Sequence, residues 1–201
     1  MNRILSLALL SLGLSTPAAA ATWQIDTSHS RMGFKVKHMM ISWVQGEFGD
    51  FSGTIDYDPA APDQTRADVT IQVASIDTDE PKRDAHLVSP DFFDATTHPT
   101  LTFQSTKVRK VKGDDLELVG NLTMRGVTKE VVLQVSDLSA PVADAWGNLR
   151  VGASATTTLN RQDWGVSWND TLDAGGVVVS DEVILMLDVE MSRPVQASAQ
   201  R

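Results

Sequence analysis

The chain alternates between apolar and polar residues over most of its length, which is typical of strands with one buried face. In the first such run Met32, Phe34 and Val36 share one face, and Lys35 and Lys37 lie on the other. The same alternation predicts further strands, about eight in all, around residues 53–57, 69–73, 101–104, 116–124, 131–135, 149–159 and 183–191.

Two segments depart from this alternation. Phe48 and Phe51 fall out of phase with Gly49 between them, which predicts a bulge or bend. Residues 79–94 have helical spacing, with Pro81 suited to a first helical turn, and predict one short helix near residues 81–88 and a single turn around 90–94.

An acidic all-β chain of this size has to protect its sheet edges, and closing the sheet removes them. Eight strands enclose an interior that side chains can just fill, or that holds one elongated ligand. We therefore predict an all-β fold, an eight-stranded antiparallel barrel with one short helical insertion. Periodicity alone does not separate this barrel from two stacked sheets.

The first 21 residues have the features of a secretory signal. Arg3 precedes an apolar run over residues 4–14, Pro17 ends that run, and residues 18–21 satisfy the A-x-A cleavage rule. The run is shorter than the roughly 20 residues a membrane span needs, and no second one follows. We predict a periplasmic protein without stable membrane insertion, divided into a signal peptide (1–21), one barrel domain (22–193) and a polar tail (194–201).

Composition excludes several classes of partner and chemistry. The chain has 17 Lys and Arg against 26 Asp and Glu, a formal net charge of −9, which argues against binding nucleic acid. The same acidity disfavours electrostatic docking on an anionic membrane surface. Cysteine is absent, so disulfides, thiolate metal sites and cysteine nucleophiles are excluded.

Catalytic and metal-binding motifs are missing as well. The four histidines form no H-x-x-x-H pair, residues 77–80 lack the glycine and terminal glutamate of a calcium loop, and no G-x-S-x-G elbow occurs. We predict no catalytic residue, no metal and no cofactor other than a bound lipid. An enzyme acting on a lipid, with His38 or Asp163 as its acid–base group, is the alternative.

The inward faces of the predicted strands supply the candidate ligand contacts. His38 continues an apolar face, either as a core histidine or as a polar contact to a lipid headgroup. Phe92 and Phe93, on the helical insertion, form either a lid over one barrel end or a structural plug. Trp164 is either a packing anchor or a ligand platform. The candidate ligand-binding residues are Met32, Phe34, Val36, His38, Ile71, Val73, Phe92, Phe93, Leu101, Phe103, Leu118, Leu122, Leu133 and Trp164.

Five segments in order resemble the YceI-like polyisoprenoid-binding proteins of bacterial envelopes. They are W-x-I-D-x-x-H-S with F-K-V-K-H and G-E-F (residues 23–48), R-D-A-H-L-V-S-P-D-F-F-D (83–94), H-P-T-L-T-F (98–103), G-N-L-T-M-R-G-V-T-K-E-V (120–131) and L-N-R-Q-D-W-G-V (159–166). Trp164 stands where the family usually has Phe.

The resemblance implies a lipocalin-like barrel whose apolar lumen binds a long isoprenoid chain, a polyprenyl lipid or an isoprenoid quinone. It also implies a homodimer in some members, and it brings no catalytic residues. A fatty-acyl or amide ligand in the same lumen, and a barrel whose core is simply filled, are the other binding and structural hypotheses.

Overall fold

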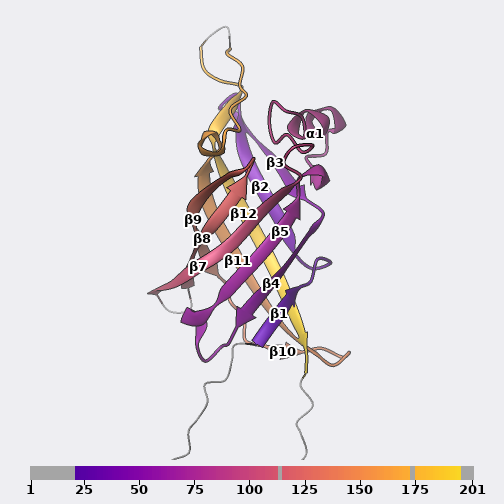
Figure 1. Cartoon of the computed structure of the whole chain (residues 1–201), viewed down its shortest axis with the longest axis vertical. Helices are drawn as coiled ribbons and strands as arrows, with labels where there is room; N and C mark the ends of the chain where they lie inside the picture. The colour runs from indigo at the N-terminus through magenta and orange to yellow at the C-terminus, as the bar shows by residue number, and fades with distance from the viewer. Residues whose placement is uncertain (1–20, 113–114, 173–174, 196–201) are drawn as a thin grey trace, which may run out of the picture.

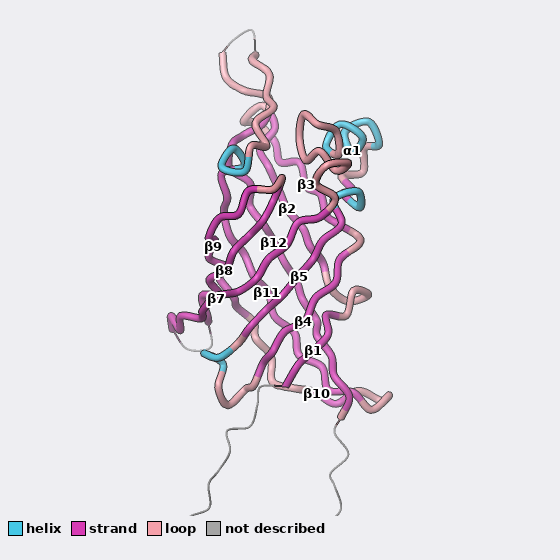
Figure 2. Tube along the Cα trace, in the orientation of Figure 1, coloured by secondary structure: helices cyan, strands magenta, loops and turns pink. Residues whose placement is uncertain are grey.

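The protein folds into one antiparallel sheet that closes on itself as a barrel (Figure 1; Figure 2). The computed structural model describes residues 21–112, 115–172 and 175–195. The predicted signal peptide, except for Ala21, and the tail beyond Val195 lie outside the described residues.

The barrel has eight strand positions, and three of them hold two consecutive strand segments. The split positions are β1 (Ala21–Ile25) with β2 (Arg31–His38), β3 (Ser42–Phe48) with β4 (Phe51–Tyr57), and β5 (Arg66–Gln72) with β6 (Ile76–Asp77). The other five are β7 (Thr100–Lys112), β8 (Asp115–Met124), β9 (Val127–Ser136), β11 (Asn148–Asn160) and β12 (Val179–Pro194), and the two-residue β10 (Val142–Ala143) adds to the edge of β11.

β12 closes the barrel because it pairs on both of its sides. It pairs with β11 along one side and with β2 and then β1 along the other, where Val183 faces Val36 and Ser192 faces Gln24. The predicted eight-stranded antiparallel barrel is therefore confirmed, and two stacked sheets are ruled out.

The predicted bend at Gly49 is also confirmed. β3 ends at Phe48 and β4 begins at Phe51, and the Gly49 N–H donates to the carbonyl of Ser75 (3.1 Å) instead of continuing the ladder. The out-of-phase residues Phe48 and Phe51 both end up buried as a result.

The predicted helix is present as α1 (Pro81–Leu87). Pro81 occupies its first turn, and the Glu80 carboxylate before it accepts the Lys82 N–H (3.2 Å), which satisfies one free donor of that turn. Three short 3-10 turns complete the helical content among the described residues: η1 (Pro62–Gln64), η2 (Val73–Ser75) and η3 (Arg161–Trp164). None of these helices is long and apolar enough to cross a membrane.

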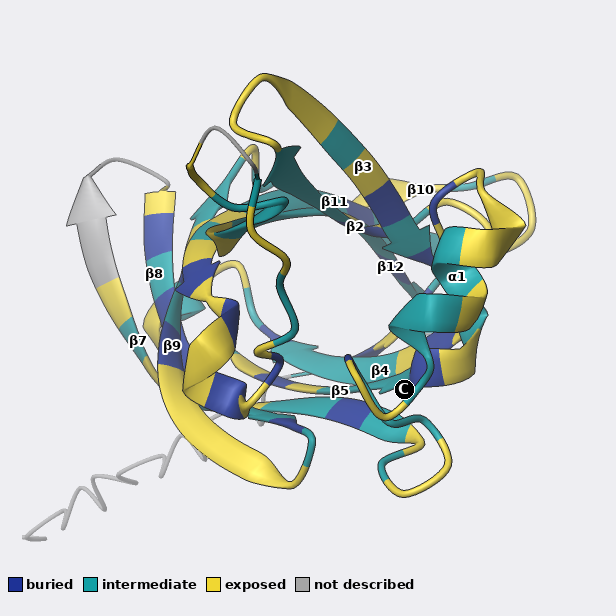
Figure 3. Ribbon diagram, turned by 90° about the horizontal axis from the view of Figure 1, so that it is seen from above, coloured by how far each residue is buried: buried dark blue, intermediate teal, exposed yellow. Residues whose placement is uncertain are grey.

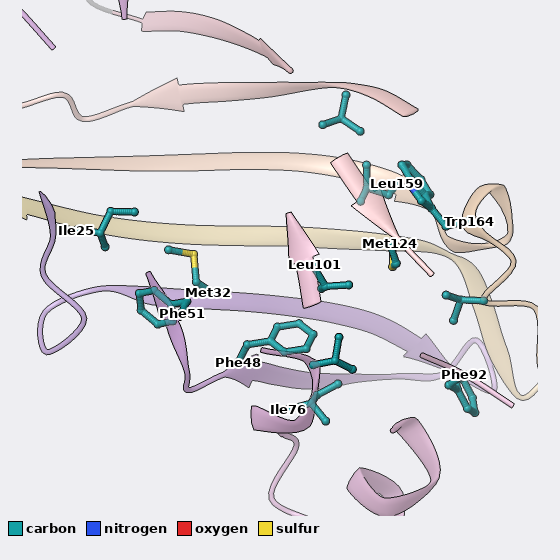
Figure 4. Packing of buried hydrophobic residues seen from close by; sticks show 13 residues of the cluster. Ile25, Met32, Phe48, Phe51, Ile76, Phe92, Leu101, Met124, Leu159 and Trp164 are labelled. Atoms are coloured by element: carbon teal, nitrogen blue, oxygen red, sulfur yellow. The ribbon is translucent and has the colours of Figure 1, made fainter. Parts of the chain in front are cut away.

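The two ends of the barrel differ in what covers them. α1 lies over one end, here called the helical end, whereas β1 starts and β12 finishes at the opposite, terminal end (Figure 1; Figure 3). Buried side chains form one cluster that runs along the barrel from Ile25 to Phe92 and Trp164 at the helical end (Figure 4). Its members are Ile25, Met32, Phe48, Phe51, Val73, Ile76, Phe92, Leu101, Met124, Val131, Leu159, Trp164 and Val166.

Candidate ligand-binding lumen

The middle of the barrel and its terminal end enclose an apolar cavity, the lumen. Its unfilled space, open mouth included, comes to about 1140 Å³. All eight strand positions contribute inward side chains. The lining residues are Ile25, Met32, Ile55, Tyr57, Thr65, Ala67, Val69, Ile71, Phe103, Val108, Leu116, Leu118, Leu122, Val131, Leu133, Val135, Leu138, Val151, Ala153, Ser154, Ala155, Leu185, Leu187, Val189 and Met191.

No charged side chain is among the described residues that line the lumen, and only three of them have a polar side chain. The Thr65 hydroxyl donates to the carbonyl of Pro62 (2.7 Å), and the Ser154 hydroxyl donates to Asp188 (3.0 Å). Tyr57 packs with Trp23 at the terminal end. The lumen can therefore bind an apolar ligand through its shape and its apolar contact area. It offers few polar groups that could recognise a ligand headgroup.

Six of the candidate residues predicted from the sequence line this lumen. They are Met32, Ile71, Phe103, Leu118, Leu122 and Leu133. Each occupies the apolar phase of an alternating run, so strand periodicity predicted that its side chain points inward.

Sequence reasoning missed the lining residues of β11 and β12. Leu185, Leu187 and Val189 alternate with period two, as do Val151 and Ala153. The signal was present in both strands, because each was predicted as a strand, but no lumen residue was assigned to either.

Five other candidates lie in the cluster at the helical end and do not line the lumen. Val73 is fully buried in η2, and Phe34 packs on the cluster through Phe48, with their ring centroids 5.8 Å apart. Phe92, Leu101 and Trp164 are less than 10% exposed within the same cluster (Figure 4 labels these three).

Phe93 is half-buried against that cluster, with its ring edge-on to Phe48 at 6.0 Å. Val36 and His38 are half-buried near the end of β2, also away from the lumen lining, with His38 paired to Ser42 and Val179 in the sheet.

Aromatic rings hold the helical insertion against the barrel. His86 on α1 packs edge-on to both Phe92 and Trp168, each at a centroid distance of 4.9 Å. Arg125, at the β8–β9 turn, donates to the carbonyl of Pro90 (2.8 Å) and to that of Phe92. The insertion is thus fixed to two neighbouring segments that come from elsewhere in the chain.

A buried cation, Arg161, fixes the loop beside it. Arg161 is 5% exposed and donates to the carbonyls of Ser180 (2.9 Å), Val166 (2.6 Å) and Trp168 (2.9 Å). Burial lowers the pKa of this guanidinium, although the nearby Asp181 acts in the opposite direction. These hydrogen bonds all go to backbone carbonyls, so Arg161 positions Trp168, and its other terminal nitrogen is buried 3.5 Å from Asp181 without a hydrogen-bond partner.

Charged groups gather instead on the outer face near the terminal end. Arg150 donates to Asp26 (2.6 Å), to Asp144 (2.8 Å) and to Glu190. The hydrogen bond from Arg150 and a second from His29 lower the pKa of Asp26 from 3.8 to about 2. Asp26, His29 and Glu190 lie close enough to share a metal ion, but the Arg150 guanidinium already donates to the carboxylates of both Asp26 and Glu190.

Neither group suggested for acid–base chemistry faces the lumen. Asp163 is about half exposed and lies 3.7 Å from Lys129, and His38 is near the end of β2. Since general acid–base catalysis needs a group within hydrogen-bond reach of the reacting atom, these positions do not serve a ligand held in the lumen.

Comparisons with known proteins agree with this architecture. The family model of the YceI-like domain matches residues 23–191. A UPF0312 protein of Pseudomonas aeruginosa is 39% identical over 191 residues, which cover 92% of this chain and 96% of that protein.

Solved structures share the barrel. The crystal structure of Burkholderia cenocepacia BcnA superposes with a TM-score of 0.73 at 26% identity, covering 83% of this chain and 98% of BcnA. A polyisoprenoid binding domain from Saccharophagus degradans, implicated in plant cell wall breakdown, has the same fold (TM-score 0.61) at 17% identity, covering 88% of this chain and 100% of that domain. Because the family model spans most of the chain, the protein belongs to the YceI-like domain family.

Proposed function

We propose that this protein is a periplasmic carrier that holds one long isoprenoid chain, a polyprenyl lipid or an isoprenoid quinone, in its lumen. It catalyses no reaction on that ligand. The observation that carries the proposal is a lumen to which all eight strand positions contribute and which is lined, among the described residues, by no charged side chain.

The size of the lumen supports a long apolar ligand. A ten-residue strand such as β8 spans about 33 Å, and a tilt near 40° leaves a height of roughly 25 Å. A chain longer than that has to fold back or protrude from the mouth.

The energetics favour an alkyl chain over a compact polar ligand. Burying one isoprene unit contributes about 4 kcal/mol before the cost of ordering the chain. A few buried units therefore suffice for tight binding without any polar contact. A fatty-acyl chain satisfies the same physics, so the isoprenoid class rests on family membership and on the binding named for the Saccharophagus degradans domain.

The cellular location rests on the N-terminal sequence. Arg3, the apolar run over residues 4–14 and the A-x-A site have the order of a secretory signal. N-terminal sequencing of the protein from the periplasmic fraction should find Ala21 or Thr22 first. Recovery of the uncleaved chain in the cytoplasm would contradict the location and leave the binding proposal intact.

The direct test is to identify what the purified protein carries. Extraction with organic solvent followed by mass spectrometry should release one isoprenoid per chain. A fatty acid or amide at the same stoichiometry would show that this lipid class, and not an isoprenoid, is the ligand. An extract without lipid from a folded protein would favour a filled structural barrel.

A matched pair of variants ties the ligand to the lumen. Ala155→Trp places an indole inside the cavity, whereas Thr158→Trp places the same ring at an exposed position on the same strand. We expect the first variant to lose bound lipid and the second to keep it, with both remaining folded by circular dichroism. Equal lipid content in the two variants would place the ligand elsewhere.

A further inference from the structure

Large apolar side chains crowd together at the turn between β2 and β3. Of the eight large hydrophobic residues that are exposed among the described residues, four fall within residues 39–43. Ile41 is 78% exposed, and Met39, Met40 and Trp43 are each about 40–50% exposed (38%, 48% and 44%). Figure 3 shows the exposed first residues of β3 at the rim of the helical end. Single exposed hydrophobics are ordinary, but a contiguous group marks an interaction surface.

The backbone holds these side chains outward. Met39 and Met40 both have positive φ values, 48° and 61°, which are unusual for residues with a side chain. The Met39 N–H donates to the carbonyl of Val178 (2.8 Å), and the Ile41 N–H donates to that of His38 (3.0 Å). The exposure is therefore built into a hydrogen-bonded turn.

Two lysines stand beside the turn on the outer face of the barrel. The ammonium groups of Lys35 and Lys37 lie 5.1 and 4.4 Å from the centre of the Trp43 ring. Neither lysine has a carboxylate within ion-pair distance among the described residues, whereas Arg31 on the same strand is paired with Glu47. Both positive charges are thus available to an external anion.

We propose that this surface, residues 39–41 with Lys35, Lys37 and Trp43, docks the protein on a phospholipid bilayer that contains anionic lipids. Tryptophan favours the depth of the headgroups, where its ring is partly apolar and its N–H stays wet. Lysine keeps its charge at the phosphates while its stem lies along apolar surface. The three apolar side chains of the turn would enter the boundary between headgroups and acyl chains.

The same charges argue against self-association through this surface. A twofold contact centred on this surface would bring the lysines of both copies close together, and like charges brought together at an interface are repelled. An anionic headgroup layer presents the complementary charge.

The attraction is local, because the chain as a whole has a net charge of −9. Acidic residues also lie near this surface. The Asp170 carbonyl accepts the N–H of Val178, whose own carbonyl accepts the Met39 N–H, and Glu182 lies on β12, which pairs with β2. We therefore expect the apolar residues to supply most of the affinity, and the two lysines to supply the preference for anionic lipid.

This surface adds a docking step to the proposed carrier, and vesicle binding tests it whether or not the lumen holds lipid. The test is flotation with vesicles of phosphatidylcholine, with or without phosphatidylglycerol. Met39→Asn, Met40→Asn and Ile41→Ser together remove the apolar side chains, with asparagine chosen because it tolerates positive φ. We expect this triple variant to bind phosphatidylglycerol vesicles roughly a hundredfold more weakly than the parent.

Lys35→Gln with Lys37→Gln should weaken binding to the anionic vesicles by roughly tenfold, with little change on phosphatidylcholine alone. The control is Trp146→Ser, which removes an apolar residue that is 80% exposed at the β10–β11 hairpin and should leave binding unchanged.

The proposal is overturned if the parent binds neither vesicle, if the triple variant floats as well as the parent, or if Trp146→Ser causes the same loss. A triple variant that only changes from dimer to monomer, or only loses an acidic protein partner, also overturns it. Vesicle binding by a protein whose solvent extract is clean would instead refute the carrier and leave the docking surface standing.

Discussion

The two ends of this barrel follow the same apolar alternation and reach opposite outcomes. Toward the helical end the inward side chains fill the interior. In the middle and toward the terminal end they leave a cavity unfilled, which is the lumen. Five of the six phenylalanines belong to the packed cluster or contact it without lining the lumen, and only Phe103 also borders the cavity. Ala67, Ala153 and Ala155 occupy comparable inward positions around the lumen.

The contrast shows that side-chain volume, and not periodicity, decides whether a stretch of barrel is a core or a binding site. A small barrel of eight strands has just enough interior for side chains to fill. Phenylalanines and Trp164 fill the interior toward the helical end, whereas alanine and valine are among the residues that line the lumen, and Trp23 packs with Tyr57 in a separate small cluster at the terminal end. The variants below test this division from the largest expected effect to the smallest.

A charge placed where the two regions meet should have the largest effect. Phe103→Asp introduces a carboxylate into the lumen lining without a partner, and an isolated buried charge is costly. We expect lipid retention to be lost and the free energy of unfolding to fall by more than about 4 kcal/mol, measured by urea denaturation. Gln104→Lys adds a charge to the next, exposed position, where it faces Asp68 across the strands, and should cost less than about 1 kcal/mol. Normal lipid retention in a folded Phe103→Asp protein would place this face outside the ligand site.

Removing aromatic volume from the helical end should open the packed region. Phe92 is 6% exposed in the cluster and Phe93 packs against it, so Phe92→Ala with Phe93→Ala should lower stability by about 3 kcal/mol or more. If the insertion is a lid, the double variant should transfer lipid to acceptor vesicles faster than a variant that loses the same stability elsewhere in the cluster. Phe51→Ala removes a ring of the same cluster from β4 and is the control. A lower melting temperature with parental transfer in the double variant would show the insertion to be a structural plug only.

Sequence reasoning succeeded wherever a local rule determined the outcome. Strict alternation located the strands, Pro81 located α1, and the phase change around Gly49 located the bend. It failed to divide the inward residues, because Phe34, Leu101 and Phe103 obey one pattern and differ only in the volume around them. That volume depends on which strands face each other across the barrel, and no local pattern contains it.

Acid should weaken the charge cluster at the terminal end, because Arg150 is bonded there to Asp26, Asp144 and Glu190. The folded state lowers the pKa of Asp26 from 3.8 to about 2, chiefly through Arg150, so its contribution is complete above pH 3.8 and is lost as the pH falls toward 2. We expect a loss on the order of 1–2 kcal/mol across that interval, reduced by solvent screening. In Asp26→Asn this part of the pH dependence of unfolding should disappear. An unchanged pH profile in the variant would assign the acid sensitivity to other carboxylates.

The smallest effect should come from a substitution that keeps the packing and removes one hydrogen bond. The Trp164 indole N–H donates to the carbonyl of Leu122 (3.1 Å), and this bond ties η3 to β8 beside the lumen residue Leu122. Trp164→Phe introduces the residue that the family usually has and leaves that carbonyl without this donor. We expect a loss of about 1 kcal/mol, because one such bond contributes about that much and the smaller ring leaves little empty space. Lipid content should stay at the parental level, since Trp164 belongs to the packed cluster and not to the lumen lining. Lost lipid with unchanged stability would instead make Trp164 a ligand contact and extend the binding site into the helical end.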